Sequence, residues 1–238
     1  HWIGGMGIIV LTIAILPLLG VGGMELFASE SPGPTKDKIH PRIKETAKRL
    51  WLIYFSLTAI QCVLLLFGGM DFYDAINHSL TTMSTGGFST KQASIGHFDS
   101  AYIQYVVILF MFLAGTNFTL LYFGFKLNFK KFWINDEFKW YVAAIIVLCF
   151  VIFPTVYFVY GRADGVEASF RAVLFQVTSI ITTTGYATSD YTLWGSFVTF
   201  LFFLLLFTGA SAGSTSGGMK LVRIVLLMKN GFLEFKKR

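Results

Sequence analysis

Long apolar segments alternate with short polar ones along most of the chain. Four of them have the length that an α-helix needs to cross a bilayer, about 20 residues, and only Lys139, at the edge of the last, brings a charge into them. They are Trp2–Met24, Leu50–Gly69, Ala101–Phe125 and Phe138–Tyr160. A fifth, Leu193–Phe207, is about five residues too short to span by itself. The pattern predicts an all-α polytopic membrane protein.

The composition supports this prediction. Hydrophobic residues make up 55% of the chain and charged residues only 13%, about half the charged share of an average soluble domain. Lipid accepts apolar side chains on the outside of every helix, whereas a soluble protein cannot bury so many. We therefore expect the chain to be surrounded by a lipid bilayer and to bind no nucleic acid.

A short glycine-containing motif occurs twice, with Thr85 and Thr183 at equivalent positions 98 residues apart. Aligning Phe72–Thr90 with Phe170–Thr188 without gaps pairs Thr85-Gly86-Gly87-Phe88 with Thr183-Thr184-Gly185-Tyr186. The second copy is similar to the Thr-Val-Gly-Tyr-Gly strand of potassium filters, whose backbone carbonyls replace the ion's hydration shell. One copy alone would favour an ordinary glycine turn. Two copies in register, each between apolar runs, predict pore loops.

The basic residues define the sidedness of the chain. Most lie in three clusters, at 35–49, 126–139 and 220–238, which the positive-inside rule assigns to the cytoplasm. The first two clusters share a side only if Asp71–Met83 dips into the membrane and returns, and the same holds for Ser169–Ile181. Re-entrant segments are tolerated where protein or water surrounds them. Each unit is therefore helix, pore helix, filter, helix. We interpret the external acidic residues, Asp74 among them, as ordinary solvated carboxylates.

The filter prediction covers five residues in each copy. They are Ser84, Thr85, Gly86, Gly87 and Phe88 in the first, and Thr182, Thr183, Thr184, Gly185 and Tyr186 in the second. The carbonyl oxygens expected to hold K⁺ are those of Thr85, Gly86, Gly87, Thr183, Thr184 and Gly185. Gly87 and Gly185 suit a strand whose carbonyls all turn one way, because glycine adopts backbone conformations that other residues avoid. The pore helices would direct their partly negative C-terminal ends toward the cation.

A small, polar insert, Gly209–Met219, interrupts the last apolar region. Together with the apolar segments on either side, it predicts one broken membrane helix, which requires a water-filled cavity or protein around the insert. Lys220 follows the insert, where its ammonium would either meet ions or extend to the interface. The insert contains near misses for a G-x-S-x-G elbow and for a P-loop, which both lack required partners, so we predict no enzyme. The two cysteines and four histidines form no metal-binding or catalytic pattern.

Five motifs in order give the chain a family resemblance. They are Trp2–Val10, Pro32–Asp37, Gly86–Thr90, Thr183–Tyr186 and Gly209–Lys220. With them the chain resembles the membrane subunit of Trk-type bacterial potassium uptake systems, in the superfamily that also holds the Ktr and HKT transporters. The resemblance implies that the insert is a gate below the filters. The gate residues would be Gly209, Gly213, Ser214, Gly217, Gly218 and Lys220.

The resemblance also implies an organisation and partners. The family has four such units in one polypeptide, and this chain would be an internal part of it that lacks the first and fourth filters. The predicted boundaries are 1–28 (last helix of the first unit), 29–49 (cytoplasmic loop), 50–125 (second unit, filter 84–90), 126–137 (cytoplasmic loop), 138–228 (third unit, filter 182–188, break at 209–219) and 229–238 (basic tail).

By the same resemblance, the full-length protein would take up K⁺ through the bacterial cytoplasmic (inner) membrane. It would form a homodimer and bind a cytosolic nucleotide-binding regulatory subunit. It would need no covalent cofactor, and the potassium ion is its substrate. The alternatives are a sodium or mixed-cation transporter of the same fold and, from another class, a non-conducting membrane scaffold.

Overall fold

Helices make up nearly all the regular structure of the protein. The computed structural model describes residues 1–5, 43–128, 130–160 and 165–237. In these ranges the elements are α3 (Ile43–Phe67), α4 (Phe72–Met83), η2 (Ser94–His97), α5 (Ala101–Ala114), α6 (Phe118–Phe125), α7 (Lys130–Ile134), α8 (Asp136–Thr155), η3 (Val156–Tyr160), α9 (Gly165–Ile181), η4 (Tyr191–Trp194), α10 (Ser196–Leu205), β1 (Thr208–Gly209), β2 (Met219–Lys220) and α11 (Leu221–Lys237). The prediction of an all-α protein is confirmed, since β1 and β2 are one parallel pair of two-residue strands.

Helices α3, α4 and α5 form a first unit with its own hydrophobic core. Tyr54, Met83 and Met111, one from each helix, are fully buried there. The chain turns from α3 into α4 at Gly69, whose φ of 92° lies in the left-handed region. Helix α5 begins at Ser100, whose side chain accepts a hydrogen bond from the N–H of Ile103, an N-cap that satisfies one of the free donors of the first turn.

Helices α8, α9 and α10 form a second unit of the same order. Its core contains the buried side chains of Tyr141, Ile181 and Phe202. Asn135 caps α8 by accepting from the N–H of Phe138 at 2.9 Å. In both units a long helix comes first, a shorter helix (α4 or α9) follows, and a coil segment leads to the next helix. These coil segments contain the two predicted filters.

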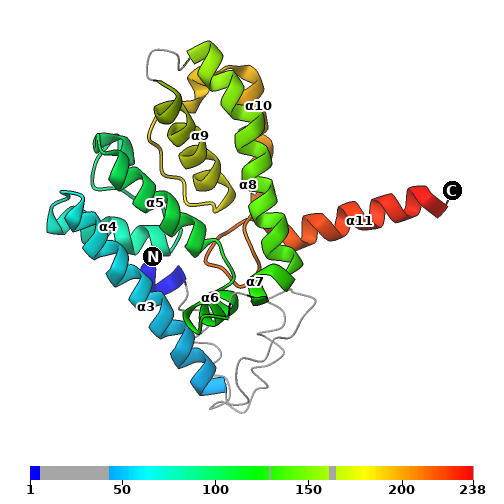
Figure 1. Cartoon of the computed structure of the whole chain (residues 1–238), viewed down its shortest axis with the longest axis horizontal. Helices are drawn as coiled ribbons and strands as arrows, with labels where there is room; N and C mark the ends of the chain where they lie inside the picture. Colours follow the sequence, from blue (N-terminus) through cyan, green and yellow to red (C-terminus); the bar gives the residue numbers. More distant parts are fainter. Residues whose placement is uncertain (6–42, 129, 161–164, 238) are drawn as a thin grey trace.

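The two units lie side by side with a loop between them. Figure 1 shows α3 along one side of the molecule and α8 along the other, with α5 next to α9 in the centre. The loop between β1 and β2, drawn in orange, reaches into the middle of the molecule, and α11 runs outward from there. Helix α11 continues through most of the segment 229–238, where the sequence analysis expected only a basic tail.

The predicted span Ala101–Phe125 is not one helix. Helices α5 and α6 meet at an angle of 111° across a break at residues 115–117. Asn117, at the end of the break, caps α6 by accepting from the N–H of Thr119 at 2.8 Å. The break leaves carbonyls at the end of α5 without donors from their own helix, and N–H groups of the loop between β1 and β2 donate to them.

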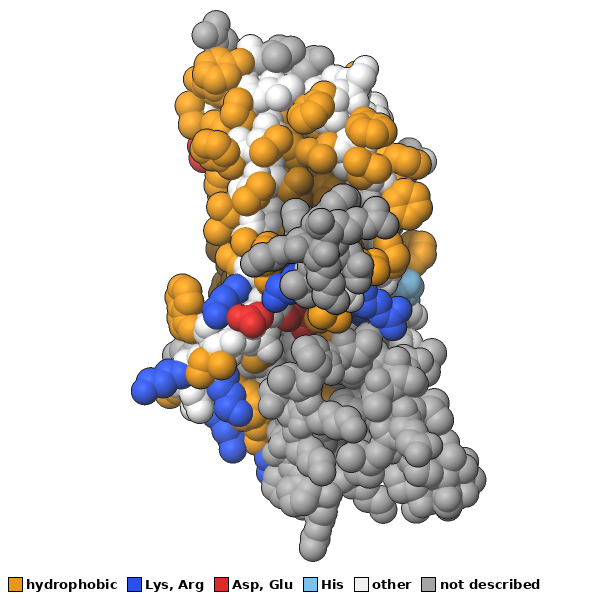
Figure 2. All heavy atoms as spheres, turned by 90° about the vertical axis from the view of Figure 1, so that its right-hand side faces the viewer, with side chains coloured by type: hydrophobic (Ala, Val, Ile, Leu, Met, Phe, Trp, Pro, Cys, Tyr) orange, Lys and Arg blue, Asp and Glu red, His pale blue; other side chains and the backbone are white. Residues whose placement is uncertain are grey.

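Two helices of the described residues are long and apolar enough to cross a membrane. They are Arg49–Phe67 and Asp136–Phe158, and the bent pair α5 and α6 adds a third if it counts as one span. The prediction for Trp2–Met24 and most of that for 29–49 lie outside the described residues. Figure 2 shows hydrophobic side chains over the upper part of one face, with Lys and Arg gathered below them. Large apolar side chains of α8 and α10, such as Phe150 and Phe200, are exposed on these helices.

Candidate ion filters and gate loop

The two filter segments, 84–90 and 182–188, share an unusual backbone conformation. Thr85 and Gly87 have φ values of 52° and 66°, and their counterparts Thr183 and Gly185 have values of 55° and 85°. A β-branched residue at positive φ is a rare conformation that persists only where the surrounding structure enforces it. The same alternation at equivalent positions means that the two sequence copies also have equivalent backbones.

Hydrogen bonds divide the filter carbonyls into two groups. Thr81 Oγ1 of α4 donates to the carbonyl of Phe88 at 2.9 Å, and Ser179 Oγ of α9 donates to the carbonyl of Tyr186 at 2.7 Å. These two carbonyls are turned back toward α4 and α9 and are not among the six that were expected to hold K⁺. Within the described residues, no donor reaches the carbonyls of Thr85, Gly86, Gly87, Thr183, Thr184 and Gly185.

The inner ends of the two filters are bonded to the pore helices and to neighbouring hydroxyls. The Ser84 carbonyl lies 2.8 Å from the hydroxyl of Thr85. The hydroxyl of Thr182 donates to the carbonyl of Thr178 at 2.8 Å and lies 2.8 Å from that of Thr184. The side chains at this level are therefore occupied with bracing the filters.

The two filters come into direct contact at Gly87. A Cβ atom placed on Gly87 would lie 1.9 Å from the carbonyl oxygen of Thr184, a distance that no side chain tolerates. The equivalent position in the other filter is open on the side of the described residues, because a Cβ atom on Gly185 would meet none of their atoms within 4 Å. Gly87 is thus required both for its left-handed backbone and for the close approach of the filters.

The aromatic residues that follow the glycines are anchored differently. Tyr186 is fully buried, and its hydroxyl lies 2.5 Å from Thr81 Oγ1 in the pore helix of the other unit. Phe88 is 65% exposed and touches the ring of His1 with a centroid separation of 5.5 Å. The 182–188 filter is therefore fastened to the first unit, whereas the side chain of Phe88 has little support among the described residues.

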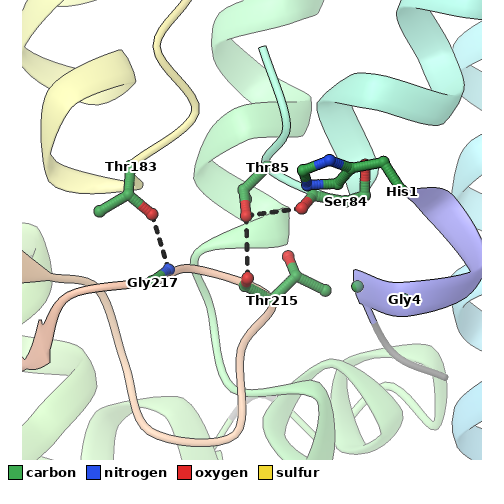
Figure 3. Close-up of a pocket in the computed structure, with 8 residues that line it drawn as sticks. His1, Gly4, Ser84, Thr85, Thr183, Thr215 and Gly217 are labelled. Carbon is green, nitrogen blue, oxygen red and sulfur yellow. Dashed lines mark hydrogen bonds between the residues drawn. The ribbon is translucent and has the colours of Figure 1, made fainter. Parts of the chain in front are cut away.

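The gate loop, Gly209–Met219, lies directly beneath both filters (Figure 3). The hydroxyl of Thr85 lies 2.8 Å from the carbonyl oxygen of Thr215. The N–H of Gly217 donates to the hydroxyl of Thr183 at 2.7 Å. The loop is thus hydrogen-bonded to the same threonine of each repeat.

The loop also fills the break between α5 and α6. The N–H of Ser211 donates to the carbonyl of Gly115 at 3.1 Å, and the N–H of Phe118 donates to the carbonyl of Gly213 at 3.0 Å. Thr215 Oγ1 lies within 3.2 Å of the carbonyls of Met83 and Ala114. Residues 210–212 are almost completely buried. The small, polar insert of the sequence is thus a packed and hydrogen-bonded loop in the structure.

Two charged side chains hold the loop from outside. Glu137 Oε1, in the first turn of α8, accepts a hydrogen bond from the N–H of Ala212 at 2.5 Å. The ammonium of Lys220 donates to the carbonyl of Ser216. Lys220 is thus in contact with the loop itself, and the two roles expected for it, meeting ions or extending to the interface, stay predictions.

A pocket of about 520 Å³ lies at the inner mouth of the filters. Ser84, Thr85 and Thr183 line it from the filters, Thr215 and Gly217 from the gate loop, and His1, Gly4 and Gly5 from the start of the chain. Its lining contains no Asp, Glu, Lys or Arg side chain, and hydroxyl and backbone groups predominate. No group of His, Cys, Asp and Glu side chains that could hold a metal ion occurs among the described residues.

Comparisons with known proteins agree on one family. The family model described as "Cation transport protein", TrkH, matches residues 1–238. The Trk system potassium uptake protein TrkH of Salmonella typhimurium is 45% identical over 242 residues, and that of Escherichia coli K12 is 44% identical over 247 residues. Both matches cover all of this chain and 49% of the relative.

A solved structure gives the same result. The crystal structure of the potassium transporter TrkH from Vibrio parahaemolyticus matches with a TM-score of 0.82 and 39% sequence identity, over 99% of this chain and 48% of that one. The chain thus spans about half the length of the relatives it matches. The family is one of transporters, which agrees with the absence of a complete enzyme motif. The chain belongs to the TrkH family of cation transport proteins.

Proposed function

We propose that this chain forms two of the pore units of a potassium uptake protein, and that K⁺ passes between its filters. One observation carries the proposal: two filters with equivalent backbones lie directly above a loop bonded to both, and six of their carbonyls accept no hydrogen bond from any residue that the structure describes. Backbone carbonyls that accept no hydrogen bond from the protein are available to replace the hydration shell of a cation.

The repeat supports a ring of such filters. Two segments cannot surround an ion, so the remaining carbonyls must come from further units. The chain covers about half the length of its relatives, which leaves room for such units in the full-length protein. The wider context, also a proposal, is a homodimer in the bacterial inner membrane that binds a cytosolic nucleotide-binding subunit. Transport needs no covalent chemistry, and so no catalytic residue.

The gate loop would control the pathway from below. Its hydrogen bonds to Thr85 and Thr183 put it across the inner mouth of both filters, so ions can pass only after these bonds break. Each neutral hydrogen bond contributes about 1 kcal/mol net, so a few of them hold the loop closed and still allow a regulatory partner to open it.

Ion flux through the full-length protein in liposomes tests both parts. We expect Rb⁺ uptake, as a tracer for K⁺, to exceed Na⁺ uptake, and deletion of Ala210–Ser216 to increase it. Thr215→Val removes the hydroxyl that reaches Met83 and Ala114 and should raise flux in the same direction without shortening the chain.

Thr208→Val is the matched control. Thr208 lies at the edge of the loop and donates only within its own segment, to the carbonyl of Leu205 at 2.7 Å, so its loss should leave the flux unchanged. Equal Na⁺ and Rb⁺ fluxes would favour the mixed-cation alternative. No cation flux from correctly folded protein would favour the scaffold, and loss of flux on deletion of the loop would make it a structural linker.

A further inference from the structure

A buried carboxylate braces the outer end of the 84–90 filter. Asp74, in the first turn of α4, is only 4% exposed. Thr90 Oγ1 donates to its Oδ1 at 2.6 Å, and Lys91 Nζ lies 3.1 Å from its Oδ2. Both carboxylate oxygens are thus held by residues at the very end of the filter. The interpretation of Asp74 as a solvated external carboxylate is wrong, because the side chain is buried and paired.

A histidine extends the brace to the preceding residue. His78 is fully buried, and its Nδ1 lies 2.7 Å from the carbonyl oxygen of Asp74. A carbonyl only accepts, so Nδ1 carries the hydrogen and Nε2 of the neutral ring accepts from Ser89 Oγ at 2.8 Å. The same Ser89 oxygen accepts from the N–H of Lys91 at 3.1 Å. Ser89, Thr90 and Lys91 are therefore all tied to one turn of the pore helix.

The other filter lacks this brace. Positions 98 residues further on replace Asp74, His78, Ser89 and Lys91 by Ala172, Gln176, Ala187 and Ser189. There the outer end is held by the first unit instead: Gly96 N–H donates to the carbonyl of Ala187 at 3.0 Å, and the N–H of Ala187 lies 3.3 Å from Ser94 Oγ. The buried hydroxyl of Tyr186 adds a further anchor, whereas Phe88 at the equivalent position is largely exposed.

We propose that Asp74 is a positioning residue that sets the cation selectivity of the 84–90 filter. The inference rests on the proposed function, since it assumes that the carbonyls of Thr85, Gly86 and Gly87 bind the ion. Only one residue, Phe88, separates Gly87 from the first braced residue, Ser89. A smaller ion such as Na⁺ would require the carbonyls to move inward. The brace opposes this movement, because buried charge-assisted hydrogen bonds are strong and costly to break.

The test compares Rb⁺ and Na⁺ fluxes through full-length protein in liposomes. Asp74→Asn keeps the size of the side chain but removes its charge, and should lower the Rb⁺/Na⁺ flux ratio by about tenfold, the size expected for one charge-assisted hydrogen bond. Asp74→Glu retains the carboxylate and should keep much of the ratio. The control is Glu167→Gln, which breaks an ion pair of the same length, 3.1 Å to Arg171, on the exposed side of the other pore helix.

The ratio separates positioning from a general role in stability, since a merely destabilised protein loses both fluxes together. If Asp74→Asn does not fold, Thr90→Val removes one bond of the brace and should lower the ratio in the same direction. A selective wild type whose ratio is unchanged in the folded variants would overturn the inference and leave the proposed function intact. Wild-type protein without selective flux would overturn both.

Discussion

The contact between the filters at Gly87 allows a sharp prediction with a built-in control. Gly87→Ala and Gly185→Ala introduce the same methyl group at equivalent positions of the repeat, both at positive φ. Both variants must therefore bear the strain of an L-residue in the left-handed region, about 1–2 kcal/mol. Within the described residues, only Gly87→Ala also meets another atom, the carbonyl oxygen of Thr184 at 1.9 Å.

The magnitude of the second effect follows from this distance. The two atoms must separate by about 1 Å before they reach the shortest spacing that a packed interior allows. Overpacking of this kind costs about 1–3 kcal/mol, so Gly87→Ala should destabilise the protein by about 2–5 kcal/mol in total. The displaced atom is one of the six carbonyl oxygens proposed to bind K⁺.

We therefore expect Gly87→Ala to lower the Rb⁺/Na⁺ flux ratio by about tenfold or more, because a shift of this size is large compared with the difference in radius between the two ions. Gly185→Ala should have a much smaller effect on the ratio. Fluxes are measured in liposomes and normalised to folded protein, and thermal unfolding in detergent ranks the stabilities. Equal effects of the two variants, or a larger effect of Gly185→Ala, would refute the assignment of Gly87 to the point where the filters meet.

Three further predictions follow from single contacts. Glu137→Gln weakens the bond to the Ala212 N–H and should increase basal ion flux several-fold, with unchanged flux arguing against a role in holding the loop. Tyr186→Phe removes a buried hydroxyl bonded to Thr81 and should lower the unfolding free energy by about 1–2 kcal/mol, as read from the thermal midpoint. Asn135→Ala removes the N-cap of α8 and should cost about 1 kcal/mol in the same assay without altering the flux ratio, whereas an altered ratio would mean that this cap influences the filters.

Much of the architecture could be predicted from the sequence because its signals are local or repeated. Apolar length alone predicts α3 and α8, since a helix that faces lipid must be apolar over the thickness of a bilayer. The gap-free alignment of the two motifs predicts that Thr85 and Thr183 occupy equivalent backbone positions, and both adopt the same left-handed conformation. Repetition provides this information because equivalent segments fold under the same local constraints.

The details of the filters depend on contacts that a linear pattern does not contain. Thr81 lies seven positions before Phe88, and only the tertiary structure shows that its hydroxyl donates to the carbonyl of Phe88. Asp74 looked like a solvated loop residue, yet it is buried against Lys91. A signal was present, because Asp74 and Lys91 are charged positions whose counterparts 98 residues further on, Ala172 and Ser189, are uncharged. The pairing of these two residues, however, requires the tertiary structure.

The sequence by itself determined that the chain is an α-helical membrane protein with a repeated glycine-containing motif and a small, polar interruption near its end. Only the tertiary structure decided that α5 and α6 bend apart at residues 115–117 and that the gate loop fills the gap. The physical reason is that every buried backbone N–H and C=O group needs a hydrogen-bond partner. The carbonyls at the break between α5 and α6 accept hydrogen bonds from the gate loop, about 100 residues further along the chain. The local pattern of apolar and polar residues does not show which distant segments form such bonds.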